Sequence, residues 1–200
     1  MIKNIVFDIG DVLVGYNPEK YIKQNDMKIE RVNKANDILI KDNNWREYLN
    51  GNIKVEKLVQ YFEERYPELK KEFKVLLLKK YNKYILYEVK ANTTLLKELS
   101  NKYHIYLLSN ITKETFENIK IEYDFMQYIK GGVYSYQEHL SKPEPKIYQK
   151  LIEKYQLNPS ETIYVDDRKK NIEISKKLGM IGIQYEEGIS LKEKLGGILD

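Results

Sequence analysis

The sequence has no cysteine and only two histidines among its 200 residues. Without cysteine, the chain has no disulfide framework, no thiolate nucleophile and no cysteine-ligated zinc, and two histidines argue against a histidine-rich metal site. Long hydrophobic runs are also missing, because the longest purely aliphatic run is the tetrad at 75–78. A span of the bilayer needs about 20 such residues. The first residues also lack the features of a secretion signal. We therefore expect a cytoplasmic protein with no membrane partner.

Neither sign of charge is in large excess. Lysine and arginine number 34 against 30 acidic residues, which gives a net charge of +4 at pH 7. A nucleic-acid-binding protein usually gathers its excess positive charge on one face. Here the lysines are interspersed with glutamates, as in segment 54–83, and this pattern is typical of a solvated surface. We expect no nucleic-acid partner.

The hydrophobic pattern changes character along the chain. Residues 2–8 form a short β-rich run that ends in a carboxylate and is followed by Gly10, which predicts a strand leading into a turn. From 18 to 87 the apolar residues recur at three- and four-residue steps, which predicts helices throughout, including one from Pro67 to Tyr84.

Beyond residue 88 predicted helices and strands alternate, with Asn92–Thr93 as a candidate N-cap and Thr112 as another. The predicted strands are 104–109, 131–135, 162–166 and 180–185, and the helices between them include 145–155 and 169–178. Such alternation favours a parallel sheet covered on both faces. We predict an α/β fold with a doubly wound, Rossmann-like parallel sheet, formed by residues 1–14 and 88–200, and an inserted α-helical cap formed by residues 15–87.

Ligands of such sheets bind beyond the carboxyl ends of the strands. The residues predicted at that edge are Asp8, Ser109, Asn110, Asp166 and Asp167, with Lys142 at the start of a following helix. A carboxylate can act as a nucleophile or bind a divalent cation. A hydroxyl and an ammonium group suit a phosphate, and adjacent acids suit Mg²⁺. Together these groups are the parts needed for phosphoryl transfer.

Four segments at this edge resemble the motifs of the haloacid dehalogenase-like hydrolases, in the family's order and across essentially the whole chain. They are residues 5–13, 105–110, 141–148 and 163–171. The resemblance implies that Asp8 is the nucleophile, that Ser109 and Asn110 bind the phosphoryl group, and that Lys142 neutralises it. It implies a Mg²⁺ site at Asp8, the carbonyl oxygen of Gly10 and Asp167, supported by Asp166, with Asn171 as a weaker candidate. The helical insertion resembles the small cap of the family's first subclass.

Gly10 departs from the usual first motif, in which the residue two positions after the nucleophile is a second aspartate. In the family that aspartate protonates the leaving group and activates water, and losing such a group typically costs a factor of about 10²–10⁴. A subset of the family has this Asp-x-Gly opening, as in sugar-1-phosphate phosphatases. We expect a preference for esters whose leaving group departs without a proton, such as sugar 1-phosphates. A phosphomutase is disfavoured, because it needs the missing aspartate. A dehalogenase is disfavoured as well, because it needs no cation, whereas the acidic pair Asp166–Asp167 favours one.

The expected function is hydrolysis of a small phosphorylated metabolite by a monomer or weak homodimer, through an aspartyl-phosphate on Asp8. The alternative is a catalytically silent phosphate-binding or interaction module, which only Gly10 favours. Substrate choice should depend on the cap, where Trp45 and Tyr48 are candidates for packing against a sugar ring and Arg46 for meeting an anion. Equally, Trp45 is typical of a cap core and Arg46 of a cap surface.

Overall fold

The computed structural model describes residues 1–199 and contains a five-stranded parallel sheet. Its strands run in the order β5-β4-β1-β6-β7, with β1 at the centre. The strands are β1 (Asn4–Phe7), β4 (His104–Ser109), β5 (Gly131–Tyr134), β6 (Thr162–Asp166) and β7 (Ile181–Gln184). Every neighbouring pair is parallel. The predicted doubly wound α/β fold is thus confirmed.

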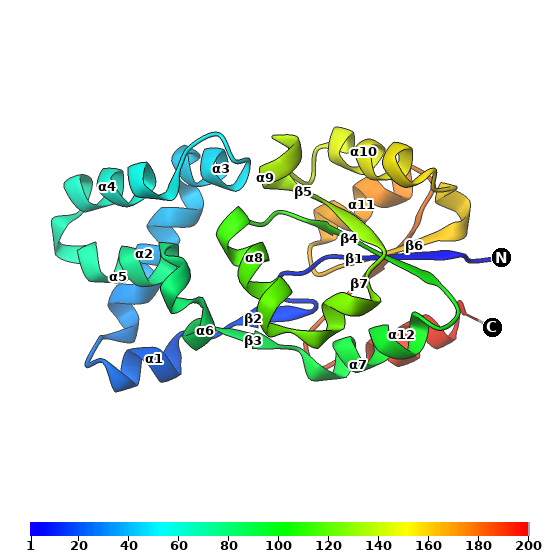
Figure 1. Ribbon diagram of the computed structural model, residues 1–200, viewed down its shortest axis with the longest axis horizontal. Coiled ribbons are helices and arrows are strands. Elements are labelled where there is room, and N and C mark those ends of the chain that lie inside the picture. Colours follow the sequence, from blue (N-terminus) through cyan, green and yellow to red (C-terminus); the bar gives the residue numbers. More distant parts are fainter. Residues whose placement is uncertain (200) are drawn as a thin grey trace.

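Helices cover both faces of this sheet, as Figure 1 shows with α10 and α11 on one side and α7 and α12 on the other. The core helices are α7 (Lys90–Leu99), α8 (Lys113–Glu122), α9 (Ser135–Glu138), α10 (Pro145–Tyr155), α11 (Lys169–Lys177) and α12 (Leu191–Gly196), with short 3₁₀ turns at Asp124–Tyr128 and Pro159–Glu161. Both faces need cover because side chains alternate along each strand: Ile5 and Phe7 enter one hydrophobic cluster, and Val6 enters the other.

The segment between β1 and α7 forms a separate helical lobe, seen at the left of Figure 1. Its helices are α1 (Glu19–Gln24), α2 (Ile29–Lys41), α3 (Asn43–Leu49), α4 (Val55–Arg65), α5 (Lys70–Leu77) and α6 (Asn82–Ile85), with 3₁₀ turns at Pro67–Leu69 and Lys79–Tyr81. This cap has its own hydrophobic core, in which Phe62 and Phe73 stack at 4.5 Å between ring centroids. Because the cap packs around its own hydrophobic core, it forms a lobe separate from the α/β core.

A two-stranded antiparallel ribbon, which the sequence did not predict, joins the cap to the core. It pairs β2 (Val14–Tyr16) with β3 (Leu86–Glu88), so the chain enters and leaves the cap side by side. The predicted cap boundaries at 14/15 and 87/88 both fall inside this ribbon. Strands of three residues are too short to show a periodic pattern, which is why the sequence did not reveal them.

Two helix predictions were wrong in detail. The single helix expected from Pro67 to Tyr84 is interrupted, because Leu78 is extended between α5 and the next 3₁₀ turn. Asn92 and Thr93 lie inside α7 rather than at its N-cap, which is Val89. Their side chains serve tertiary contacts instead: the Asn92 amide donates to the carbonyl oxygen of Val12 at 2.7 Å, and the Thr93 hydroxyl donates to Glu88. Thr112 does cap its helix, by accepting from the Thr115 N–H.

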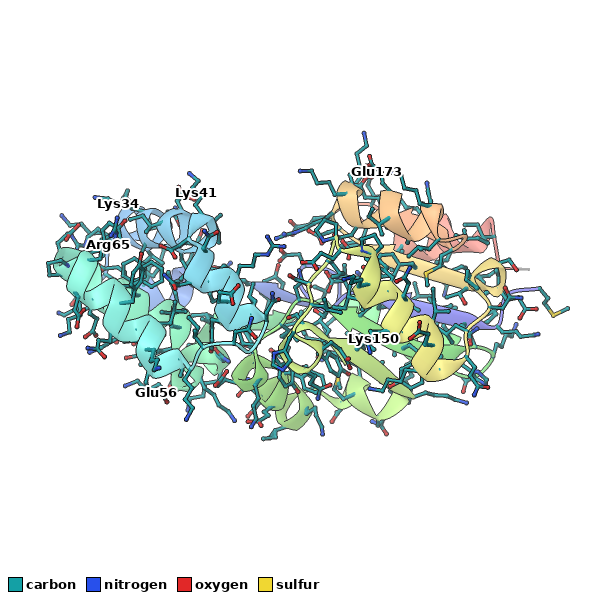
Figure 2. All side chains as sticks on the ribbon, turned by 90° about the horizontal axis from the view of Figure 1, so that it is seen from above. Lys34, Lys41, Glu56, Arg65, Lys150 and Glu173 are labelled. Atoms are coloured by element: carbon teal, nitrogen blue, oxygen red, sulfur yellow. The ribbon has the colours of Figure 1, made fainter. Side chains whose placement is uncertain are left out.

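Charged side chains project from both lobes, as Figure 2 shows for Lys34, Lys41, Glu56 and Arg65 on the cap and Lys150 and Glu173 on the core. Several are neutralised by partners, such as Lys70 and Lys74 around Glu63. Among residues 1–199, none of the helices combines the length and apolar character that crossing a membrane requires.

Candidate active site

The predicted acidic and basic residues meet at the carboxyl edge of the sheet. Asp8 follows β1, Ser109 and Asp166 end β4 and β6, and Lys142 lies between α9 and α10. The Lys142 ammonium lies 2.9 Å from Asp8 Oδ2 and 2.7 Å from Asp166 Oδ2, and its side chain is 1% exposed. The central position of β1, between β4 and β6, is what brings these three strand ends together.

Asp8 is held on both oxygens at the end of β1. Its Oδ1 accepts from the Ile9 N–H at 2.7 Å, and its Oδ2 pairs with Lys142. Burial raises the pKa of Asp8 to about 6; the Lys142 charge lowers the pKa and the Asp166 charge raises it further, while the Ser109 hydroxyl favours the carboxylate. Asp8 is thus a buried carboxylate that shares the single ammonium group of Lys142 with Asp166.

Asp166 is saturated with partners. Its Oδ1 accepts from the Arg168 N–H at 2.8 Å and from the Asn171 amide at 2.9 Å, and its Oδ2 accepts from Lys142 and from the Tyr164 hydroxyl. Burial opposes its ionisation, but Lys142 and the donors of Tyr164 and Arg168 together hold the pKa of Asp166 below its ordinary value. Asp166 therefore orients Lys142 and has no free lone pair directed elsewhere in this arrangement.

Asp167 has a different environment from its neighbour. It is half-buried and lines the cleft, and burial together with the Asp166 charge raises the pKa of its carboxyl group. One carboxylate oxygen from each of Asp8, Asp166 and Asp167 lies within 4.8 Å of the others. Hard oxygen donors with this surplus of negative charge fit Mg²⁺, which binds through one or two carboxylates. Asp8 and Asp167 are the residues best placed to hold such a cation.

Asn110 lies in the cleft, but its side chain is engaged with the backbone of Lys142. The Asn110 amide donates to the Lys142 carbonyl oxygen at 2.9 Å, and its oxygen accepts from the Lys142 N–H at 2.8 Å. This reciprocal pair fixes the loop that carries the lysine. The Asn110 side chain thus positions Lys142, while the phosphate contact expected from the sequence stays a prediction, since Asn110 also lines the cleft.

A cleft of about 910 Å³ lies between these residues and the cap. Trp45 and Arg46 of α3 line it, and Arg46 forms an ion pair with Glu144 of the core at 2.8 Å. Tyr48, which the sequence suggested as a substrate contact, is not among the lining residues. It is buried in the cap core, and its hydroxyl donates to Glu114 of α8 at 2.9 Å. Within one turn of α3, Trp45 and Arg46 thus line the cleft, while Tyr48 contacts the core.

Residues 49–51 of the cap contact residues 135–139 of the core, in and next to α9. Ser135 Oγ donates to the Leu49 carbonyl oxygen at 2.6 Å, and the His139 ring lies 2.8 Å from the Asn50 carbonyl oxygen. Gly51 has a φ of +72° and approaches the Tyr136 backbone so closely that a Cβ would lie 2.4 Å from its oxygen. Glycine is required there for both reasons. These contacts hold the C-terminal end of α3 against the core.

Sequence reasoning missed Tyr164, which donates to Asp166 from beneath the site and is fully buried. The spacing of the two residues could have indicated this contact. Tyr164 and Asp166 are two residues apart on β6, so their side chains lie on the same face of the sheet. It also missed Ile40 and Leu49, which line the cleft from the cap. No local pattern separates these two from the other apolar residues of α2 and α3.

Tyr164→Phe should lower the free energy of unfolding by about 1.5–3 kcal/mol, because the hydroxyl donates to a buried carboxylate. Tyr148→Phe is the matched comparison, since the Tyr148 hydroxyl donates to a neutral carbonyl oxygen of Asn171 at 3.2 Å. That variant should lose only about 0.5–1.5 kcal/mol. Urea unfolding followed by circular dichroism measures both values, and equal losses would show that the hydrogen bond to Asp166 has no special weight.

A buried carboxylate, a lysine paired with it and an acidic pair, all at the carboxyl edge of a parallel sheet, are the groups that phosphoryl transfer requires. The haloacid dehalogenase-like hydrolase family model matches residues 2–179. The chain belongs to the haloacid dehalogenase-like hydrolase family.

Two curated relatives match about half of the chain. A D-ribitol-5-phosphate phosphatase of Bacteroides thetaiotaomicron is 35% identical over 109 residues, which are 51% of this chain and 52% of the relative. A sesquiterpene phosphatase of Aspergillus oryzae is 25% identical over 99 residues, 49% of this chain and 50% of the relative. The chain thus spans about half the length of the curated relatives it matches.

The fold is similar to solved structures over nearly its whole length. A family enzyme from Bacteroides thetaiotaomicron, crystallised with magnesium and inorganic phosphate, superposes with a TM-score of 0.77 at 23% identity, covering 97% of this chain and 99% of that one. A predicted family hydrolase from Porphyromonas gingivalis gives a TM-score of 0.74 at 20% identity, covering 100% and 98%. At these identities the likeness shows a shared fold.

Proposed function

We propose that the protein is a phosphatase that hydrolyses small phosphorylated metabolites through an aspartyl-phosphate on Asp8. The observation that carries this proposal is the buried cluster of Asp8, Lys142 and Asp166, with Lys142 within 2.9 Å of both carboxylates. The curated relatives, both phosphatases, support the same reaction. A silent binding module is not favoured, because the chain retains Asp8, Lys142 and the Asp166–Asp167 pair and both curated relatives are phosphatases.

In the proposed reaction a carboxylate oxygen of Asp8 attacks phosphorus, the bond from phosphorus to the ester oxygen breaks, and the alkoxide leaves and takes a proton from water. Water then attacks the phosphorus of the aspartyl-phosphate and the bond from phosphorus to the Asp8 oxygen breaks, which releases inorganic phosphate and restores the carboxylate. We expect Lys142 and Ser109 to contact the oxygens of the transferred group, where a positive charge and a hydroxyl donor stabilise negative charge. Mg²⁺, held by Asp8, Asp167 and the Gly10 carbonyl oxygen with support from Asp166, would supply further charge neutralisation.

The first test is phosphate release from a panel of sugar 1-phosphates, sugar and polyol 5- and 6-phosphates, and acetyl phosphate. We expect release with Mg²⁺, none with a chelator, and recovery when Mg²⁺ is restored. Full activity in the presence of the chelator would contradict the proposed metal site. Absence of release from every ester and from acetyl phosphate would contradict the proposed function itself.

Gly10 bears on which substrates are preferred. No acidic side chain stands at this position to protonate the leaving oxygen, so esters that leave without a proton, such as sugar 1-phosphates, should react fastest. The bacterial relative is instead named for a polyol 5-phosphate, whose leaving group is a primary alcohol. The panel compares the two classes directly, and faster turnover of the 5- and 6-phosphates would contradict the leaving-group argument.

Gly10→Asp should accelerate hydrolysis of primary alcohol phosphates by about 10²-fold or more, while changing acetyl phosphate hydrolysis little. The substitution fits sterically, because a Cβ at Gly10 would have no neighbour within 4 Å. Gly10→Ala is the control for any effect of the side chain on the backbone. If the alanine and aspartate variants change the two rates equally, the missing acid does not limit the reaction.

A further inference from the structure

The cap side of the cleft is apolar apart from one ion pair. Of the four cap residues that line it, three are hydrocarbon-rich: Ile40 at the end of α2, and Trp45 and Leu49 on α3. Trp45 and Leu49 are four residues apart, so they share one face of the helix. Ile40 is 55% exposed, an unusual position for a large aliphatic side chain in a lobe that has its own core. We call these three residues the apolar cap wall.

The fourth cap residue, Arg46, does not offer a free charge to the cleft. Its guanidinium lies 2.8 Å from the Glu144 carboxylate, and Glu144 is only two residues beyond Lys142. The pair therefore neutralises a carboxylate that would otherwise repel an anionic substrate near the phosphate-binding lysine. The ion pair also means that Arg46 and Glu144 together add no net charge to the outer part of the cleft.

We propose that the alcohol part of the substrate is uncharged at its far end and presents a rigid hydrocarbon face, which packs against the apolar cap wall. An aromatic ring, a branched aliphatic group or the C–H face of a cyclic sugar meets this description; a linear polyol does not. The inference rests on the proposed function for the phosphate end of the site. Its physical basis is that only a ligand with apolar surface gains free energy by covering Ile40, Trp45 and Leu49.

Calorimetric titration with non-hydrolysable phosphonates, in the presence of Mg²⁺, tests the proposal without relying on turnover. Benzylphosphonate should bind at least about tenfold more tightly than methylphosphonate, since burying one ring removes a large apolar area from water. 4-Carboxybenzylphosphonate should bind several-fold more weakly than benzylphosphonate. Equal binding of the benzyl and methyl compounds, or binding of none of the three, overturns the proposal. Tighter binding of the carboxylated compound also overturns it, because Arg46 or Arg168, both of which line the cleft, would then bind the far end of the substrate.

Ile40→Asn isolates the contribution of the wall, because this exposed side chain is not part of the cap core. It should weaken benzylphosphonate binding by about fivefold and leave methylphosphonate binding unchanged. Ile121→Asn, at a 76% exposed isoleucine of α8 outside the cleft, is the matched control and should change neither. Equal weakening of both ligands by Ile40→Asn overturns the proposal. A benzyl preference in a protein that hydrolyses no ester would instead refute the proposed function alone.

Discussion

Asp8→Asn should lower phosphate release by roughly 10⁴-fold or more, as expected when the residue that forms the covalent bond is removed. The amide is nearly the same size as the carboxylate, but it cannot attack phosphorus. It can still accept the hydrogen bond from the Ile9 N–H. Lys142 keeps its contact with Asp166 at 2.7 Å, so the variant should fold normally. Phosphate release from the best substrate of the panel, at saturating Mg²⁺, measures the effect.

Asp37→Asn is the matched control, because Asp37 is exposed on α2 and lies outside the cleft. This variant should retain full activity. If Asp8→Asn kept activity within tenfold of the native protein, the nucleophile would have to be another group, and the aspartyl-phosphate reaction would be refuted. Trapping of labelled phosphate on the native protein, absent in the variant, gives an independent readout of the covalent step.

Lys142→Met should lower the free energy of unfolding by about 3 kcal/mol and abolish phosphate release. Removing one partner of a buried ion pair leaves an uncompensated charge, which is strongly destabilising. Here two buried carboxylates, Asp8 and Asp166, lose the same ammonium group. Lys146→Met, at an exposed position on the following helix, should leave both properties nearly unchanged. Urea unfolding measures the difference.

The double variant Asp8→Asn with Lys142→Met separates the charge effect from lost packing. Removing the Asp8 charge relieves its repulsion with Asp166, so the double variant should be more stable than Lys142→Met alone. If the second substitution gives no recovery, the cost of losing Lys142 lies in its packing, and the electrostatic account of the cluster is incorrect.

The sheet could be predicted from the sequence because each strand is a short apolar run bounded by helical periodicity. β6 and α10 occupy the predicted residues, Thr162–Asp166 and Pro145–Tyr155. Once the order of strands and helices indicates a parallel sheet, the rule that strand ends meet at one edge places Asp8, Ser109 and Asp166 together. These predictions depend only on local patterns and on a general property of α/β folds.

The cap contacts could not be predicted in this way. Trp45 and Tyr48 are three residues apart on one helix, yet Trp45 lines the cleft and Tyr48 is buried with its hydroxyl on Glu114. Their roles depend on how the whole lobe is oriented over the sheet, and that orientation is set by contacts between distant residues, such as Ser135 with Leu49.

The sequence by itself thus determined the sheet, the presence of a helical insertion and the chemical groups at the sheet edge, because periodicity and strand ends are local features. Only the tertiary structure decided how those groups are used. It fixed Lys142 between two carboxylates, engaged Asn110 with the Lys142 backbone, and paired Arg46 with Glu144. The physical reason is that hydrogen-bond and ion-pair partners are chosen by distance in space, and each of these pairs joins residues far apart in the chain.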